Sequence, residues 1–246
     1  MNPGTENYAI IPCRYASTRF PGKPLSEILG KPMFYHVYQR VLESGCFKAI
    51  AIATDDFRIL NAAEKMNVPA VMTREDHPSG TDRVLEAARS LNVPENAVVV
   101  NVQGDEPALN PLILRELLEP FKNPETRVTS PAVRISADEA LSPDLVKVVF
   151  SKDMNALYFS RSRIPFDRDG IAPDYFGHIG LYAFRMKTLE QFVTLGKSRL
   201  EDIEKLEQLR LLENSIPIRM VITHHRTIGV DRPEDIKKVE ELLKSR

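Results

Sequence analysis

The chain has 246 residues, enough for one large α/β domain or two small ones. Its hydrophobic fraction of 43% and charged fraction of 27% are ordinary for a globular protein and exclude wholesale disorder. Thirty-three basic against 34 acidic residues give a net charge of −1, which argues against a nucleic-acid-coating protein. Two cysteines, Cys13 and Cys46, are too few for a disulfide framework or a four-ligand zinc site.

No apolar run approaches the ~18 residues of a membrane span. The first residues, MNPGTENYAIIP, lack the basic region and the long apolar region of a signal peptide. We therefore expect no membrane association and a location in the reducing cytoplasm.

The first half of the chain alternates short apolar runs with amphipathic segments. Strands are predicted at 8–12, 49–54, 70–73 and 97–102. Helices are predicted at 32–45, 56–67 and 81–91. Because continuous apolar runs are typical of parallel strands covered on both faces, this order predicts an α/β fold with a doubly wound, mostly parallel sheet.

The alternation of short apolar runs with amphipathic segments ends after about residue 125. Apolar runs at 127–135, 145–150, 156–160 and 178–185 have little helix between them. A helix at 199–213, a strand at 218–223 and a helix at 233–244 close the chain. We expect a single α/β domain, 1–246, whose second half, from about residue 126, adds a small mixed or antiparallel sheet. Such a sheet is a candidate for a dimer contact.

In open α/β sheets, ligands bind beyond the carboxyl ends of the strands. The loop after the first strand carries Arg14, Arg19 and Lys23, two hydroxyl side chains, and Gly22. Such a loop suits a triphosphate, although a solvated basic loop is an equally good interpretation of this segment alone. Neither GxxxxGK[ST] nor GxGxxG is present, which disfavours kinase-type ATPases and dinucleotide dehydrogenases.

Two carboxylates from distant segments are candidate magnesium ligands. Asp105 follows the strand at 97–102, and Asp231 precedes a predicted helix with Pro233 at its head. Mg²⁺ often uses one or two protein carboxylates together with substrate phosphates. From spacing alone, a turn residue for Asp105 and a helix cap for Asp231 are the better interpretations.

Longer motifs give a resemblance that covers most of the chain. They are IPCRYASTRFPGKPL at 11–25, ATDD at 53–56, HPSGTDR at 77–83, VNVQGDEP at 100–107, ALYFSRSRIPFDRD at 156–169, HIGLYAFR at 178–185, EKLEQLRLLE at 204–213 and GVDRPED at 229–235. In this order they resemble the sugar-nucleotide cytidylyltransferases, and especially those acting on 3-deoxy-D-manno-octulosonate (Kdo). The resemblance implies a nucleotide-diphospho-sugar transferase type of fold, a homodimer, CTP as substrate and Mg²⁺ as cofactor. It also implies a nucleotide-binding half, 1–125, and a sugar-binding and dimerisation half, 126–246.

The resemblance also assigns residues to roles. It implies catalytic roles for Arg14, Arg19, Lys23, Asp105 and Asp231, the two aspartates binding the metal. It implies nucleotide contacts from Pro12, Cys13, Arg14, Lys23, Met72, Thr73, Arg74, Ser79, Gly80, Thr81 and Gln103. It implies sugar contacts from Arg161, His178, Tyr182, Glu207 and Gln208. Cys13 departs from the family, which usually has alanine there.

The residues themselves support the sugar assignments only weakly. Arg161 after the strand at 156–160 could clamp a carboxylate. His178 and Tyr182 would share one face of a single strand at 178–185 because their spacing is even. In the helix at 199–213, Ile203, Leu206, Leu209, Leu211 and Leu212 would form the core face. Glu207 and Gln208 would then point elsewhere, toward sugar hydroxyls or toward solvent.

The implied reaction transfers CMP from CTP to the anomeric hydroxyl of Kdo, releasing pyrophosphate, for lipopolysaccharide synthesis. The alternative substrates are the 8-amino-8-deoxy derivative of Kdo and sialic acid. A uridylyl- or guanylyltransferase and a non-catalytic nucleotide-binding protein remain as alternative classes.

Overall fold

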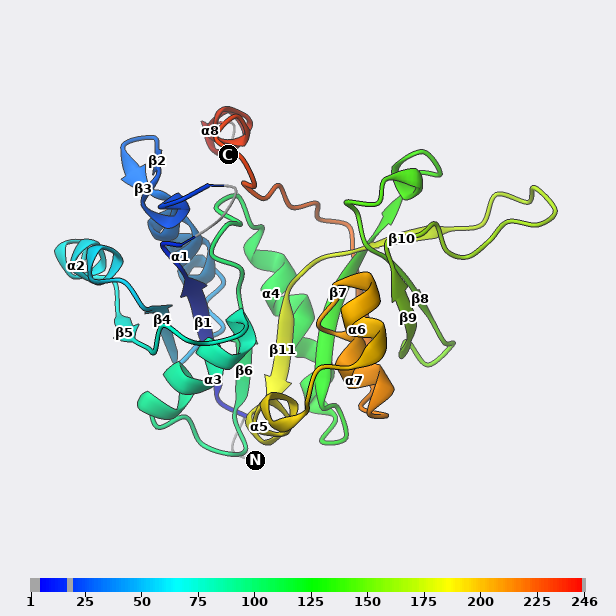
Figure 1. The fold of residues 1–246 in the computed structure, drawn as a ribbon, viewed down its shortest axis with the longest axis horizontal. Helices are drawn as coiled ribbons and strands as arrows, with labels where there is room; N and C mark the ends of the chain where they lie inside the picture. The colour runs from blue at the N-terminus through cyan, green and yellow to red at the C-terminus, as the bar shows by residue number, and fades with distance from the viewer. Residues whose placement is uncertain (1–4, 17–19, 245–246) are drawn as a thin grey trace. The chain divides into compact units, whose positions relative to one another are not determined.

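The computed structural model describes residues 5–16 and 20–244. The chain forms two compact units, the first comprising 1–115 with 227–246 and the second 116–226 (Figure 1). The second unit thus begins before the expected division at residue 125, and the C-terminal segment belongs to the first unit. No helix in the described part of the chain is long and apolar enough to cross a membrane.

The first unit is built on a parallel sheet in the order β5-β4-β1-β6. Its strands are β1 (Asn7–Cys13), β4 (Ala49–Thr54), β5 (Ala70–Met72) and β6 (Val98–Asn101). Ile10, Ile11 and Val98–Val100 are fully buried, as continuous apolar runs predict. The strand order reverses between β1 and β6, and this is where such sheets bind ligands. The predicted parallel α/β sheet is confirmed.

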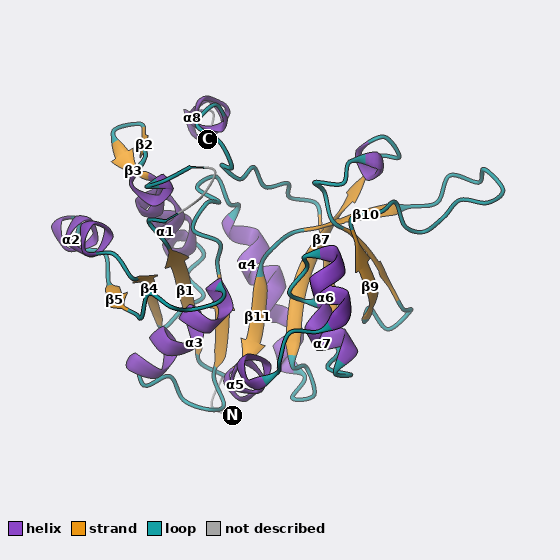
Figure 2. Cartoon of the chain, in the orientation of Figure 1, coloured by secondary structure: helices purple, strands orange, loops and turns teal. Residues whose placement is uncertain are grey.

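Helices cover both faces of this sheet (Figure 2). They are α1 (Met33–Glu43), α2 (Phe57–Lys65) and α3 (Gly80–Ser90), and α4 (Pro111–Leu118) follows β6. Right-handed crossovers place α1 and α2 on one face and α3, which leads back to β6, on the other. The short helix η1 (Lys23–Leu25) and the two-stranded sheet of β2 (Glu27–Ile28) and β3 (Lys31–Pro32) lie between β1 and α1 in sequence.

The C-terminal segment packs into the first unit through an apolar cluster of its own. It ends in α8 (Asp235–Lys244). Val230 and Val239 are fully buried against Ile28, Met33 and Ala108. This packing fixes the residues on either side of Val230, including Asp231.

The second unit has a mixed, largely antiparallel sheet, as expected for the second half of the chain. Its strands are β7 (Val128–Ile135), β8 (Lys147–Phe150), β9 (Ala156–Ser160), β10 (Tyr175–His178), β11 (Tyr182–Arg185) and β12 (Ile218–Thr223). β7 is parallel to β12 and antiparallel to β10 and β11, and β8 is antiparallel to β9 and β10. Its remaining helices are η2 (Glu119–Lys122), η3 (Glu139–Leu141), α5 (Met186–Thr194), α6 (Arg199–Glu204) and α7 (Leu209–Glu213).

Two predictions for the second half were wrong in detail. The expected strand at 178–185 is interrupted, since β10 ends at His178 and β11 begins at Tyr182. The expected helix at 199–213 breaks at Lys205, which has a left-handed φ of 55° and ends α6. Ile203, in α6 before the break, is 66% exposed and not part of the core as predicted. The break also puts Glu207 and Gln208 in the connection before α7 rather than on a helix face.

Candidate active site

A pocket of about 390 Å³ opens at the carboxyl ends of β1 and β6. Its lining residues are Pro12, Cys13, Arg14, Ala16, Lys23, Pro24, Gly80, Gln103, Gly104 and Asp105. All belong to the first unit, and six of them were predicted to contact nucleotide. The pocket therefore lies where the strand order reverses, as expected for a ligand site in such a sheet.

Lys23 joins the two candidate metal ligands. Its Nζ donates a hydrogen bond of 2.6 Å to Oδ2 of Asp105 and lies 3.9 Å from Oδ1 of Asp231. Nζ also donates to the carbonyl oxygen of Val230 at 2.8 Å. The Lys23 side chain is 14% exposed, whereas those of Asp105 and Asp231 are 35% and 58% exposed. One cation and two carboxylates from three distant segments thus meet, and two of the three, Lys23 and Asp105, line the pocket.

Main-chain contacts hold the segment around Asp231 in place. The N–H of Val230 donates to the carbonyl oxygen of Asp105 at 2.9 Å. A Cβ on Gly229 would lie 3.3 Å from Oε1 of Glu106, so glycine permits the close approach of the two loops. Asp235 accepts the N–H groups of Asp231 and Arg232 at 3.0 and 2.9 Å. The position of Asp231 is therefore set by backbone contacts on both sides.

Gly104 allows the loop after β6 to lie directly on the end of β1. A Cβ at this position would be 2.7 Å from the carbonyl oxygen of Pro12 and 2.9 Å from Sγ of Cys13. The Pro12 oxygen is a backbone atom of β1 and cannot move aside by rotation of a side chain. Any residue larger than glycine would push Gln103 and Asp105 away from the pocket.

Glu106 is a site residue absent from the predicted set. Burial, reinforced by the charge of Asp105, raises the pKa of Glu106 to about 8, and its Oε2 is buried. The only sequence signal was its position next to Asp105, and a buried carboxyl cannot be inferred from that. It packs against Gly229 and so helps to join the two loops that carry the aspartates.

Cys13 is 1% exposed, and its thiol faces Gly104. Burial, reinforced by the charge of Asp105, raises the pKa of this thiol far above its usual range. The thiol stays protonated at neutral pH, and buried structural cysteines are unreactive. Cys13 therefore contributes shape to the pocket rather than a nucleophile.

The remaining predicted nucleotide residues do not line the pocket. They are Met72, Thr73, Arg74, Ser79 and Thr81, at the end of β5 and the start of α3. The Ser79 hydroxyl caps α3 by accepting the N–H groups of Thr81 and Asp82, and it donates to Oδ2 of Asp82 at 2.6 Å. Their contacts with a nucleotide remain predictions. Arg19 lies outside the described residues.

The carboxylates beside the pocket suit Mg²⁺ only if the substrate supplies further ligands. Among residues 5–16 and 20–244, no group of three or more His, Cys, Asp or Glu side chains could hold a metal ion. Asp105 and Asp231 supply two carboxylates that share the Lys23 ammonium. Such a pair fits Mg²⁺ when substrate phosphates and water supply the other ligands, rather than Mg²⁺ held by protein alone.

In the second unit, two predicted sugar residues emerge at one edge of the sheet. Ser160 of β9 and Gly177 of β10 both pair with Lys147 of β8. Because β8 is antiparallel to both, β9 and β10 end on the same side of the sheet. β8 lies between them, so their ends are about 10 Å apart, which is twice the spacing of neighbouring strands. Arg161 and His178 are the next residues, so this edge presents both.

His178, Tyr182 and Glu207 form a compact group. The His178 and Tyr182 ring centroids are 5.4 Å apart. Burial, reinforced by the charge of Glu207, raises the pKa of Tyr182, so its hydroxyl stays protonated. Ser130 Oγ donates to the carbonyl of Leu181 at 2.8 Å and lies 2.8 Å from Nε2 of His178. Ser130 of β7 thus joins the His178 ring to the segment just before β11.

Arg161 is held by main-chain acceptors. Its Nε donates to the carbonyl of Glu204 at 2.9 Å and Nη1 to that of Pro143 at 3.1 Å. The buried Lys147 ammonium donates to the carbonyl of Arg161 itself. A further predicted sugar residue, Gln208, is 7% exposed. The group is thus partly buried and preorganised, but its sugar contacts remain predictions.

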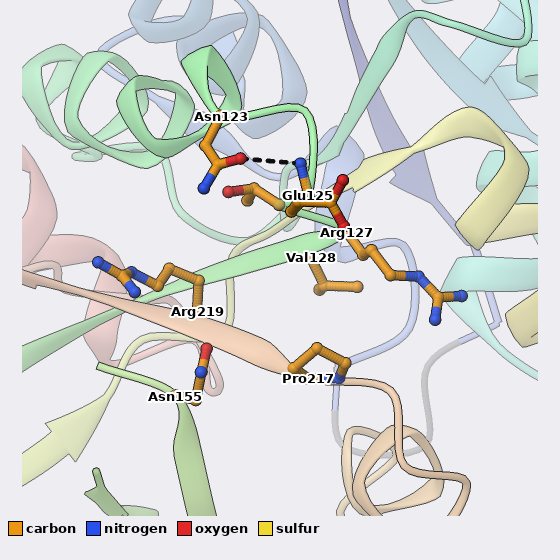
Figure 3. A pocket seen from close by; sticks show the side chains of 8 residues that line it. Asn123, Glu125, Arg127, Val128, Asn155, Pro217 and Arg219 are labelled. Carbon is orange, nitrogen blue, oxygen red and sulfur yellow. Dashed lines mark hydrogen bonds between the residues drawn. The ribbon is translucent and has the colours of Figure 1, made fainter. Parts of the chain in front are cut away.

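A second cavity in this unit contains none of the predicted residues. It measures about 350 Å³ and lies at the starts of β7 and β12 (Figure 3). Its lining residues are Asn123, Glu125, Thr126, Arg127, Val128, Asn155, Pro217 and Arg219. Arg127 and Arg219 donate to Gln191 and to the carbonyl of Asp153, so both arginines are already engaged.

Comparison with known proteins agrees with this geometry. The cytidylyltransferase family model matches residues 8–222, and the chain belongs to this family. The chain is 60% identical over 228 residues to the 3-deoxy-manno-octulosonate cytidylyltransferase of Nitratidesulfovibrio vulgaris, covering 91% of this chain and 90% of that protein. It is 53% identical over 240 residues to the enzyme of the same name from Lawsonia intracellularis, covering 97% and 94%.

A solved structure of CMP:2-keto-3-deoxy-manno-octonic acid synthetase complexed with CTP is similar throughout, with a TM-score of 0.93. It is 41% identical, covering 98% of this chain and 99% of that one. The resemblance and the fold predicted from the motifs are confirmed.

Proposed function

We propose that this protein transfers CMP from CTP to the anomeric hydroxyl of Kdo, producing CMP-Kdo and pyrophosphate. The observation that carries this proposal is the convergence of Lys23, Asp105 and Asp231 beside a pocket at the reversal of strand order. The names of the relatives favour Kdo over its 8-amino derivative or sialic acid.

The first unit supplies binding and charge for the transfer. Lys23 and Arg14 line the pocket and would offset the charge of the triphosphate. The Kdo oxygen would bond to the α-phosphorus as the bond to the pyrophosphate oxygen breaks, and the hydroxyl proton would pass to solvent. No covalent enzyme intermediate is required. Asp105 and Asp231 would hold Mg²⁺, which would neutralise phosphate charge and lower the pKa of a bound hydroxyl.

The second unit would recognise the sugar acid. Arg161 would bind its carboxylate, while His178, Tyr182, Glu207 and Gln208 would bind its hydroxyls. Their partial burial and fixed contacts favour a rigid sugar rather than a flexible chain.

The protein would function as a homodimer in the cytoplasm. Large apolar side chains are exposed in the second unit at Leu157, Phe166 and Ile171, by 62%, 85% and 80%. In the proposed dimer, the partner would cover these side chains. The two free cysteines fit a reducing compartment. CMP-Kdo would be used for lipopolysaccharide synthesis. Light scattering of the purified protein would measure the oligomeric state.

A pyrophosphate-release assay tests the proposed reaction. CTP, UTP and GTP would each be combined with Kdo, its 8-amino derivative and sialic acid. We expect release only with CTP, and fastest with Kdo. Greater turnover with another acid would reassign the substrate, and no release with any acid would refute the proposal.

A further inference from the structure

Tyr15 closes the loop that follows β1. Its carbonyl oxygen accepts the N–H of Gly22 at 2.9 Å. Its ring lies over the same glycine, because a Cβ on Gly22 would be 3.1 to 3.3 Å from Cε2, Cζ and Oη of Tyr15. Gly22 has a left-handed φ of 72°, which glycine adopts without strain. One residue therefore holds Gly22 by both its backbone and its side chain.

Two cations of the pocket stand just outside this closure. Arg14 is the residue before Tyr15, and Lys23 follows the glycine directly. Both cations line the pocket, whereas the two residues that close the loop do not. Because the closure joins the chain neighbours of Arg14 and Lys23, it sets how far apart the two positive charges are held.

An arginine of α2 covers the Tyr15 ring. Cζ of Arg58 lies 3.2 Å from the centroid of this ring, in a stacked cation–π contact. Asp56, the N-cap of α2, holds the guanidinium as a fork, since Nε donates to Oδ1 at 2.9 Å and Nη2 to Oδ2 at 2.6 Å. The Arg58 side chain is 60% exposed. It therefore ties Tyr15 to the first turn of α2 from the solvent side.

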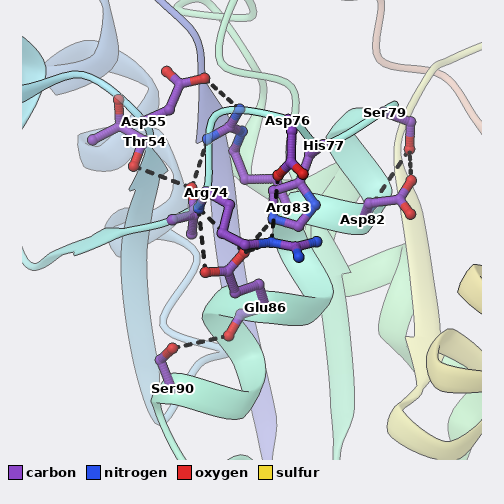
Figure 4. A network of polar contacts seen from close by, with 11 residues as sticks. Thr54, Asp55, Arg74, Asp76, His77, Ser79, Asp82, Arg83, Glu86 and Ser90 are labelled. Atoms are coloured by element: carbon purple, nitrogen blue, oxygen red, sulfur yellow. Dashed lines mark hydrogen bonds and ion pairs between the residues drawn. The ribbon is translucent and has the colours of Figure 1, made fainter.

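Another part of the pocket wall is held by contacts of its own. Gly80 lines the pocket and begins α3. Arg83, fully buried in the same helix, donates to Asp55 and Thr73, just after β4 and β5 (Figure 4). α3 is thus fixed independently of Tyr15, and a change at Tyr15 should affect the loop after β1 alone.

We propose that Tyr15, held by Arg58, is a positioning residue for polyphosphate binding. It keeps Arg14 and Lys23 at the separation that lets both contact one chain of phosphates. Both charges are then in place before the ligand arrives, and preorganisation of this kind raises affinity. The inference rests on the proposed function because the ligand is the triphosphate of that same site. Arg58 contacts no phosphate and acts through the Tyr15 ring.

The test compares Tyr15→Leu, Tyr15→Phe, Arg58→Met and the double variant Tyr15→Leu/Arg58→Met with the wild-type protein. Tyr15→Phe keeps the ring, and Arg58→Met removes the stacked cation from an exposed position. Lys65→Met is the matched control, since Lys65 is an exposed cation in the last turn of the same helix. Thermal denaturation first shows which variants are folded. Calorimetry then gives Kd for inorganic triphosphate and for CTP, and initial rates give kcat and KM for CTP and Kdo.

We expect Kd for inorganic triphosphate to rise about tenfold in Tyr15→Leu, because the two cations are no longer held in place before binding. Arg58→Met should raise it about threefold, the size of one cation–π contact at an exposed site. Because Arg58 acts through the ring alone, the double variant should bind no more weakly than Tyr15→Leu.

The kinetic constants should follow the binding constants. KM for CTP should rise in parallel with Kd, while kcat and KM for Kdo stay unchanged, because only binding is affected. Hydrogen exchange of the Gly22 N–H should be faster in Tyr15→Leu, with no change in α3. Tyr15→Phe and Lys65→Met should match the wild type in every measurement.

An unchanged Kd for inorganic triphosphate in a folded Tyr15→Leu variant would overturn the inference. So would effects that multiply in the double variant, because Arg58 would then act on the anion through its own charge. If Tyr15→Leu fails to fold, Arg58→Met decides, and an affinity equal to that of Lys65→Met contradicts the inference. A wild-type protein that binds CTP and triphosphate but releases no pyrophosphate refutes the proposed reaction, not the role of Tyr15.

Discussion

Lys23 and Asp105, 82 residues apart in sequence, are joined by a hydrogen bond of 2.6 Å. The bond ties the start of η1 to the loop after β6 and leaves the Lys23 ammonium shared between protein carboxylates. In the proposed reaction, the triphosphate and Mg²⁺ would therefore compete for both partners of this pair.

Replacing Lys23 by methionine should lower kcat/KM for CTP by ~10²-fold or more, because a charge that offsets the transferring phosphates is removed. Lys23→Arg should recover part of the loss. Steady-state rates of pyrophosphate release provide the measurement, and Lys31→Met, at an exposed position, is the control. Normal turnover of Lys23→Met would remove this residue from the proposed site.

Asp105→Asn and Asp231→Asn should each lower kcat by ~10²-fold and raise the Mg²⁺ concentration needed for half-maximal rate, because neutral amides bind the cation poorly. EDTA should abolish wild-type activity, and excess Mg²⁺ should restore it. Asp76→Asn, at a side chain that is 76% exposed, should behave as the wild type. A wild-type protein fully active after exhaustive chelation would contradict the metal assignment.

Gly104→Ala should destabilise the protein by about 1–3 kcal/mol, because the added methyl group overlaps the Pro12 carbonyl. Urea denaturation measures the free energy of unfolding. Gly196→Ala is the matched control, since a Cβ there meets nothing within 4 Å. Equal stability of the two variants would show that the loop after β6 can move away without cost.

Stability should decline in acid partly through His178. Burial lowers the pKa of His178 from 6.5 to about 3 in the folded protein. Between these values the unfolded chain binds a proton that the folded one does not, so this contribution is full above pH 6.5 and is lost as pH falls toward 3. Denaturation of His178→Gln at pH 7 and pH 4 should show a smaller loss than the wild type. His224→Gln, at an exposed histidine, should show the wild-type loss.

The sequence predicts the first unit better than the second for a physical reason. The runs that form β1, β4 and β6 are nearly all apolar because both sheet faces are covered, so their pattern is distinct. The break at Lys205 depends on a left-handed backbone conformation that lysine rarely adopts, and no local pattern signals it. No local pattern signals the interruption after His178 either.

The residues of the candidate site show the same contrast: some are marked by a sequence motif, and others depend on how the chain packs. Motifs single out Lys23, Asp105 and Asp231, and the structure brings them together. Glu106 was not among the predicted site residues, because its importance lies in its burial and in its contact with Gly229, which is distant in sequence. Charge and spacing along the chain carry no information on that burial.

The packing of Val230 and Val239 against Ile28 and Met33 has a consequence for biosynthesis. The strand β1 and the loop after it leave the ribosome early, and residues 230–239 follow much later. A nascent chain therefore cannot bring Asp231 beside Lys23 and Asp105 until Val230 and Val239 have been synthesised and have packed against residues made near its start.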